Sequence, residues 1–192
     1  KRNQAREAFV NGLLKTANFQ VHVQPTRAPV TISDAPTKGS PNAPVKIIEF
    51  TDYQCPFCSR VQGTLKQISE AYKDSVVIAV RNFPLDFHQN AKKAAVAALC
   101  SHEQGKYWDY SDKLWANQKA LDDASLKRYA SELSLNTSQF DSCLDNNKTL
   151  ATVTKDAQEG AQLGVSGTPA FFINGRLVSG ALPFENFKKI ID

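Results

Sequence analysis

The sequence of 192 residues contains no methionine and therefore no initiator residue, and it begins with Lys-Arg without an apolar signal-peptide core behind it. We interpret the chain as a mature or truncated product. No run approaches the roughly 18 apolar residues that a transmembrane helix needs. We therefore expect that the chain, as given, does not span a membrane.

An excess of one charge sign is confined to the first residues. The formal net charge of +4 arises before residue 29, where five Lys and Arg residues accompany Glu7 alone. A neutral body argues against nucleic-acid binding, which needs a clustered basic face. The basic start predicts a solvated helix face or, as the alternative, a membrane-proximal stalk.

Metal-ligand patterns are also sparse. His22, His88 and His102 share no metal spacing, and we expect surface or helix-cap roles for them. Cys100 and Cys143 are singletons, so neither supplies the second close pair of cysteines that a structural zinc site usually has. We predict no metal and no cofactor.

The first 44 residues divide into two parts. Residues 1–20 have apolar side chains at helical spacing and predict an amphipathic helix. Residues 24–44 hold five prolines and predict a linker or extended loop, in which Val30 and Ile32 favour a short edge strand.

The pattern then alternates between strand and helix. Residues 45–50 predict a strand, residues 58–72 a helix with one apolar stripe, and residues 76–80 a strand buried on both faces. This order indicates a right-handed crossover unit. Residues 88–163 lack strand-like alternation, and their helical patterns cover residues 91–100, 107–116, 125–133 and 149–163.

The last part predicts an antiparallel hairpin, residues 170–173 and 176–179 around Asn174-Gly175, followed by a helix over 183–191 that begins with Pro183. A βαβ half and a ββα half thus flank an all-helical insert. We predict one α/β domain from residues 40–87 and 164–192, a helical insert of residues 88–163, and an N-terminal helix and linker of residues 1–39.

The chemistry-bearing motif is Cys55-Pro56-Phe57-Cys58, between a strand and a helix. At a helix N-terminus, unpaired N–H groups and the positive end of the dipole stabilise a thiolate, which is the attacking species. Cys55 is therefore the predicted nucleophile, and Cys58, one turn into the helix, is predicted to resolve the mixed disulfide. A lone C-x-x-C also starts zinc ribbons, but the context here favours redox chemistry.

Two segments carry a family resemblance. IEFTDYQCPFC (residues 48–58) resembles the active-site segment of DsbA-like proteins, and GVSGTPAFF (residues 164–172) resembles the segment that faces it. The resemblance covers about residues 40–192. It implies an α/β fold in which a thioredoxin domain is interrupted by an all-helical insert. The N-terminal helical extension predicted above from its apolar spacing lies outside the resemblance.

The resemblance also implies roles for particular residues. Thr168-Pro169 is expected to be a cis peptide bond packed against the Cys55 sulfur, which lets a substrate strand pair with the exposed backbone edge. Glu49 matches the acidic residue beneath the resolving cysteine, and a buried carboxylate there exchanges the Cys58 proton through water. The alternative for Glu49 is a solvated side chain at a strand end.

Two further features concern support of the site. Cys100 and Cys143 are predicted to form a structural disulfide, on the even cysteine count and an oxidising compartment, with two buried free thiols as the alternative. Phe57 lies in an exposed turn and is predicted to contribute, beside Pro56, to an apolar substrate-docking patch.

The predicted enzyme is a thiol–disulfide oxidoreductase that acts on protein thiols or disulfides outside the cytoplasm, in the periplasm or an equivalent compartment. A dithiol oxidase ranks first, an isomerase or reductase second, and a peptide-binding chaperone last. Phe57 replaces the histidine of the family's strong oxidants, which puts oxidising strength in question. Expected partners are protein substrates and a membrane redox protein for recycling; a homodimer through the N-terminal helix and a tether upstream of residue 1 are further possibilities.

Overall fold

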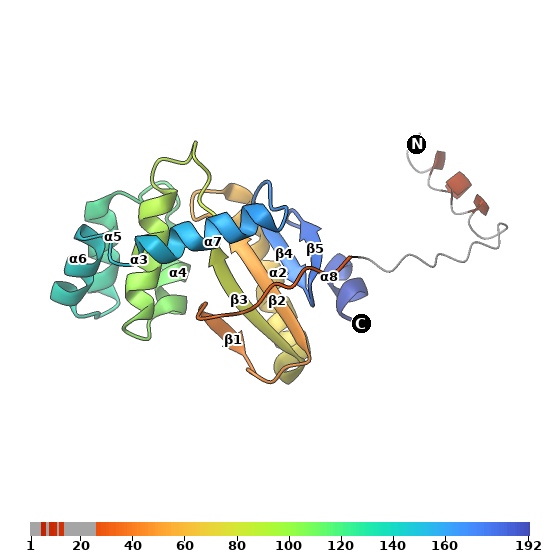
Figure 1. Ribbon diagram of the computed structural model, residues 1–192, viewed down its shortest axis with the longest axis horizontal. Coiled ribbons are helices and arrows are strands. Elements are labelled where there is room, and N and C mark those ends of the chain that lie inside the picture. Colours follow the sequence, from red (N-terminus) through yellow and green to blue (C-terminus); the bar gives the residue numbers. More distant parts are fainter. Residues whose placement is uncertain (1–4, 7, 11, 14–25) are drawn as a thin grey trace.

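The computed structural model describes residues 5–6, 8–10, 12–13 and 26–192. Its centre is a five-stranded sheet of order β1-β3-β2-β4-β5, with helices on both faces (Figure 1). The strands are β1 Thr37–Gly39, β2 Val45–Thr51, β3 Val76–Asn82, β4 Ala170–Ile173 and β5 Arg176–Ser179. Only the β2–β3 pair is parallel among these five strands.

Alternate residues of the strands pack against different helices. On one face, the helices α2 (Pro56–Tyr72) and α8 (Phe184–Ile191) cover a core that includes Ile47, Ile78 and Phe171. A short 3-10 turn, η1 (Lys73–Ser75), connects α2 to β3. On the other face, a smaller core that includes Ile48 and Phe172 also contacts the extended segment 28–35. Both central strands are thus buried on two faces, as a parallel pair requires.

The helical insert forms beside this sheet. Its helices are α3 Ala91–His102, α4 Tyr107–Ala116, α5 Asp123–Glu132, α6 Thr137–Asp145 and α7 Leu150–Gln162. Asp122 and Asn136 cap α5 and α6 by accepting hydrogen bonds from the backbone N–H groups of Ser125 and Gln139, both at 3.0 Å. Figure 1 shows α7 running from this group back across the sheet.

Charged side chains attach α7 to the sheet. The Arg81 guanidinium on β3 pairs with the carboxylates of Asp156 and Glu159 on α7, and the backbone and side-chain N–H groups of Asn82 donate to Asp156 Oδ2, both at 3.0 Å. Gly160 permits the close approach, because a Cβ atom there would lie 2.9 Å from the rings of Phe50 and Phe83. The insert is therefore anchored to the central strand pair.

The predicted fold class is confirmed, and four of the five strands lie where the sequence predicted them. The hairpin turn has positive φ at both Asn174 and Gly175, as its sequence predicted. Of the predicted N-terminal helix, residues 5–6, 8–10 and 12–13 are helical, and the rest lies outside the described residues. The domain limits at residues 39, 87 and 163 stay a prediction.

Two local predictions were wrong, and one helix of the insert was not singled out. Val30 and Ile32 form no strand, and the edge strand is instead Thr37–Gly39, whose polar sequence has no apolar alternation. Helix α6 was missed, because its buried residues are only Phe140, Cys143 and Leu144. The last helix starts at Phe184, with Pro183 as its N-cap rather than in its first turn.

None of the helices described has an 18-residue stretch that is apolar enough to cross a membrane.

Candidate active site

The turn from Asp52 to Cys55 connects β2 to α2. The N–H of Cys55 donates to the Asp52 carbonyl at 3.0 Å, and the N–H of Gln54 donates to Asp52 Oδ1 at 2.7 Å. Cys55 has extended backbone angles and is the N-cap of α2, and Pro56 follows as the first helical residue. Cys55 therefore lies at the helix N-terminus, as predicted from the motif.

The two cysteines of the motif are free thiols with different environments. Cys55 is 4% exposed and Cys58 is fully buried. The pKa of Cys55 is lowered to about 5, because the Cys58 thiol and the backbone N–H groups of Cys58 and Phe57 donate to its sulfur, against the opposing effect of burial. Burial and the neighbouring Cys55 raise the pKa of Cys58. At neutral pH, the pair thus holds one thiolate, on Cys55.

Thr168 and Pro169 lie against this pair from the loop before β4. Their peptide bond is cis, and the Cys55 sulfur lies 3.4 Å from the Thr168 carbonyl oxygen. The two segments that carry the family resemblance therefore meet at the Cys55 sulfur, although Cys55 and Thr168 are 113 positions apart in the chain.

Glu49 is buried beneath the pair, at 1% exposure. Its Oε1 accepts hydrogen bonds from Thr51 Oγ1 at 2.9 Å and from Gln62 Nε2 at 3.1 Å. Burial raises the pKa of Glu49 to about 7, although these two hydrogen bonds act in the opposite direction. The alternative of a solvated side chain is wrong. The Glu49 charge also contributes to the raised pKa of Cys58.

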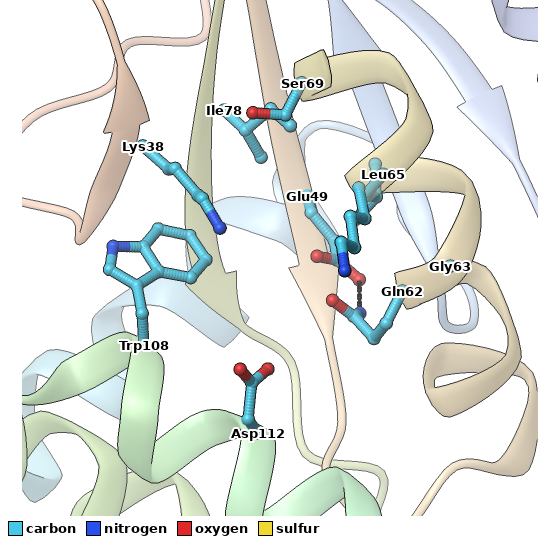
Figure 2. Close-up of a pocket in the computed structure, with 10 residues that line it drawn as sticks. Lys38, Glu49, Gln62, Gly63, Leu65, Ser69, Ile78, Trp108 and Asp112 are labelled. Atoms are coloured by element: carbon cyan, nitrogen blue, oxygen red, sulfur yellow. Dashed lines mark hydrogen bonds between the residues drawn. The ribbon is translucent and has the colours of Figure 1, made fainter.

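A cavity of about 460 Å³ has Glu49 among its lining residues. It lies between β1, α2 and α4, and Figure 2 shows Lys38 and Asp112 directed into it from β1 and α4. Gln62 and Trp108 also line it. Charged and polar side chains line part of the cavity, and its volume is large enough for several water molecules.

The helical insert contacts the active-site turn directly, which the sequence did not predict. The Tyr53 hydroxyl is bonded to the hydroxyls of Tyr107 and Ser111 at 3.0 and 2.7 Å, and the Tyr53 ring packs 4.4 Å from that of Trp115. Gln118 Nε2 donates to the carbonyls of Tyr53 and Cys55 at 2.9 and 3.0 Å. The aromatic residues of α4 thus serve the site as well as the insert's own core.

Phe57 lies on the surface beside the cysteines. Its side chain is 51% exposed, with the Arg60 guanidinium 5.0 Å from the ring centroid. A second exposed aromatic residue, Phe87 at 76%, lies in the loop after β3 and was not singled out from the sequence. The role of Phe57 in substrate docking stays a prediction.

The two histidines that the structure describes, His88 and His102, differ in burial and in contacts. His88 Nδ1 lies 2.8 Å from Asp52 Oδ2, and the His88 side chain is 19% exposed. His102 is exposed at the end of α3, and His22 lies outside the described residues. In the part of the chain that the structure describes, no cluster of three His, Cys, Asp or Glu side chains is arranged to hold a metal.

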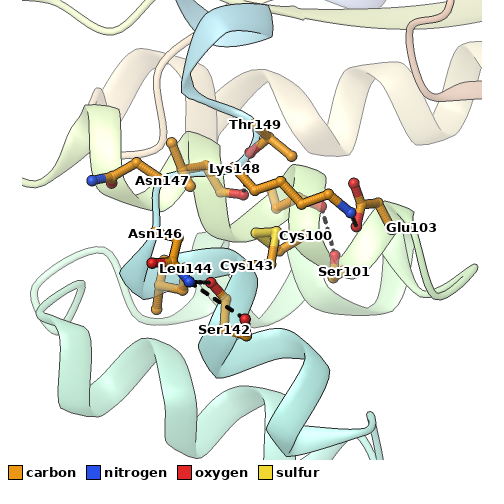
Figure 3. The surroundings of a disulfide bond; sticks show 12 residues. Cys100, Ser101, Glu103, Ser142, Cys143, Leu144, Asn146, Asn147, Lys148 and Thr149 are labelled. Atoms are coloured by element: carbon orange, nitrogen blue, oxygen red, sulfur yellow. Dashed lines mark hydrogen bonds and ion pairs between the residues drawn. A yellow bond between two sulfur atoms is a disulfide. The ribbon is translucent and has the colours of Figure 1, made fainter.

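Cys100 and Cys143 form a disulfide that joins α3 to α6 within the insert (Figure 3). The predicted pairing is confirmed, and the alternative of two free thiols is wrong. Lys148 and Glu103 form an ion pair of 2.8 Å beside it. The bond is separate from the Cys55 site and belongs to the insert's core.

Comparisons with known proteins agree with this architecture. A family model described as thioredoxin matches residues 32–192. Among curated proteins, the Na⁺/H⁺ antiporter NhaA 3 of Salinispora tropica is 36% identical over 149 residues, which are 77% of this chain and 23% of that protein. The chain spans about a quarter of the length of the curated relatives that it matches.

Solved structures share the fold over most of both chains. A thioredoxin-like oxidoreductase from Silicibacter pomeroyi is 28% identical with a TM-score of 0.76, covering 83% of this chain and 91% of that one. The thiol–disulfide exchange protein alpha-DsbA2 from Wolbachia pipientis has the same fold at 23% identity, with a TM-score of 0.75 and coverage of 83% and 87%. The resemblance to DsbA-like proteins is confirmed.

Replacing both Cys100 and Cys143 with alanine should lower the free energy of unfolding by about 4 kcal/mol, since the bond closes a long loop in the unfolded chain. Urea denaturation of the variant and of the oxidised parent measures the difference. Ser142→Ala, beside the disulfide, is the control and should change little. A loss below about 1 kcal/mol would contradict a stabilising role for the bond.

The Cys55 thiolate should depend on the Cys58 donor. In the reduced protein, thiolate absorbance at 240 nm should titrate with a midpoint near the pKa of about 5. Cys58→Ala should raise this pKa, because the donor is removed, and Cys58→Ser should raise it less, because a hydroxyl still donates. A midpoint between about 8 and 9 in the parent protein, the range of an ordinary cysteine, would show that Cys55 is not activated.

Glu49 should make the protein less stable as the pH rises. Because its pKa is raised from 4.5 to about 7 by burial, ionisation costs nothing below pH 4.5 and its full amount, about 3 kcal/mol, above pH 7. The reduced Cys55 thiol, with its lowered pKa, ionises in the same pH range and acts in the opposite direction, so the parent is compared with Glu49→Gln, both in the reduced form. In urea denaturation, the free energy of unfolding of the parent relative to Glu49→Gln should fall by about 2 to 3 kcal/mol from pH 5 to pH 8. Relative to Glu70→Gln, an exposed control on α2, it should stay constant. Equal pH dependence in Glu49→Gln and the parent would be inconsistent with a buried, neutral Glu49.

Proposed function

The chain belongs to the thioredoxin family, as a thiol–disulfide oxidoreductase of the DsbA-like type, and from this premise we propose that it oxidises the dithiols of extracytoplasmic proteins. The observation that carries the proposal is the lowered pKa of Cys55, about 5, beside a Cys58 whose pKa is raised. A stabilised thiolate favours the reduced form of the protein and so makes its disulfide form a stronger oxidant.

In the proposed reaction, the protein starts with a Cys55–Cys58 disulfide. A substrate thiolate attacks the Cys55 sulfur, the Cys55–Cys58 bond breaks, and Cys58 leaves and takes a proton. A second substrate thiolate then attacks the substrate sulfur of the mixed disulfide, and Cys55 leaves as the thiolate. Two electrons pass from the substrate to the protein, and the substrate gains one disulfide.

Glu49 is the proposed proton donor for Cys58 in the first step. It is buried near Cys58 and has a pKa of about 7, so it is partly protonated at neutral pH. The polar cavity beneath it, lined also by Lys38 and Asp112, supports transfer through water and recovery of the proton from solvent. In the reverse direction, Glu49 accepts the same proton.

The surface around Cys55 suits an extended protein segment. The Thr168 carbonyl lies 3.4 Å from the Cys55 sulfur, so a substrate strand that pairs with the backbone beside Pro169 would bring its own cysteine to Cys55. Pro56 starts the helix, and the half-exposed Phe57 offers an apolar contact next to the reacting sulfur. We propose that these residues form the substrate-docking side of the site.

Reoxidation of Cys55 and Cys58 requires an external oxidant, for which we propose a quinone-linked thiol oxidase in a membrane. The Cys100–Cys143 disulfide supports a location outside the cytoplasm, where such bonds persist. A membrane tether upstream of residue 1 and a homodimer through the N-terminal helix belong to the same proposal, and both rest on the sequence alone.

The oxidised protein should convert a reduced two-cysteine peptide to its disulfide stoichiometrically. Mass spectrometry of acid-quenched samples measures the conversion. Cys55→Ser should abolish this reaction, because no disulfide can form at the site. Cys58→Ser should instead accumulate a mixed disulfide between Cys55 and a disulfide-containing peptide. Faster rearrangement of scrambled disulfides than oxidation of dithiols would favour the isomerase. Peptide binding without any oxidation would favour the chaperone.

A further inference from the structure

The buried carboxylate of Asp52 connects the active-site turn to a second loop. Asp52 is 2% exposed, and each of its two carboxylate oxygens has a hydrogen-bond donor. Oδ1 accepts from the N–H of Gln54 at 2.7 Å. Oδ2 accepts from the N–H of Leu85 at 2.8 Å and lies 2.8 Å from His88 Nδ1.

The two segments meet because β2 and β3 are parallel and end at the same edge of the sheet (Figure 1). The turn of residues 52–55 follows β2, and the loop of residues 83–90 follows β3. A second contact reinforces the first, since the Asn90 N–H donates to Gln54 Oε1 at 2.5 Å. The turn that carries Cys55 and the loop that carries Phe87 therefore form one hydrogen-bonded unit.

A buried carboxylate is unfavourable unless its oxygens are hydrogen-bonded or paired with a positive group. Two of the donors to Asp52 are backbone N–H groups, and His88 supplies the third from a side chain. The Phe87 ring packs 4.5 Å from the His88 ring. His88 thus fixes the orientation of the Asp52 carboxylate, and that carboxylate in turn holds the N–H of Gln54.

We propose that His88 is a positioning residue for thiol–disulfide exchange at Cys55, acting through Asp52 on the turn that places Cys55 at the N-terminus of α2. The proposal rests on the proposed thiol chemistry of Cys55 but is independent of the direction of exchange. His88 touches neither sulfur in the described contacts, so its effect reaches Cys55 through two hydrogen bonds, His88 to Asp52 and Cys55 N–H to the Asp52 carbonyl.

Loss of the His88 donor has a defined consequence. Asp52 Oδ2 keeps only the Leu85 N–H among the partners described above, so a buried negative charge on the turn that carries Cys55 is less compensated. A less compensated negative charge disfavours a nearby thiolate, and a loosened turn weakens its N–H donors. Both effects act in the same direction, toward less thiolate at Cys55.

The test compares His88→Leu, which removes the donor, with His88→Asn, whose side-chain amide can donate from the place of Nδ1. In the reduced protein, His88→Leu should raise the pKa of Cys55 by about half to one unit and slow iodoacetamide alkylation at pH 5 about two- to fivefold. His88→Asn should restore both values. His102→Leu, at an exposed histidine on α3, is the matched control and should leave both unchanged.

The proposal would be overturned if the His88→Leu protein folds with an unchanged Cys55 pKa and is merely less stable to urea. It would also be overturned if His88→Asn and His88→Leu have the same Cys55 pKa and the same alkylation rate. If His88→Leu fails to fold, His88→Gln replaces it, because its amide extends toward the Nε2 position and should not reach Asp52. Alkylation needs no substrate turnover, so these outcomes are distinct from failure of the oxidase proposal, which would appear as loss of dithiol oxidation in the parent protein.

Discussion

The hydrogen bonds of the turn from Asp52 to Cys55 determine which of the two thiols ionises. They place the Cys55 sulfur where the N–H groups of Phe57 and Cys58 and the Cys58 thiol all donate to it, while Cys58 stays buried over Glu49. One cysteine is therefore prepared to attack or leave as a thiolate, and the other to hold a proton. The same two residue types differ in chemistry because one precedes the first turn of α2 and the other lies within it.

Three other parts of the structure contact this turn. The sheet delivers it through β2, the helical insert bonds to it through Tyr53 and Gln118, and the loop after β3 bonds to it through Asp52 and Gln54. The insert is itself held to β3 by the buried pairing of Arg81 with Asp156. The insert is thus part of the active site's support.

Local patterns in the sequence were enough to predict the central strands, the hairpin, the motif at the helix N-terminus and the burial of Glu49. Each depends on residues near one another in the chain or on a family motif. The contacts of Tyr53 with Tyr107, of Gln118 with Cys55 and of His88 with Asp52 join residues 36 to 63 positions apart, and no periodicity encodes such pairs. Edge strand β1 escaped prediction for a related reason, since its exposed Thr-Lys-Gly sequence becomes a strand only by pairing with β3.

The stabilised Cys55 thiolate is the structural feature that favours oxidation of substrates over their reduction. The lower the pKa of Cys55, the more stable the reduced protein is, and the stronger an oxidant its disulfide form becomes. The Phe57 side chain contributes no hydrogen bond to the thiolate, which is stabilised instead by the Cys58 thiol and by the backbone N–H groups of Phe57 and Cys58. Equilibration in glutathione redox buffers measures the outcome directly as a reduction potential. A value closer to the −120 mV or so of a strong oxidase is predicted, whereas a value near the −270 mV or so of thioredoxin would contradict an oxidase.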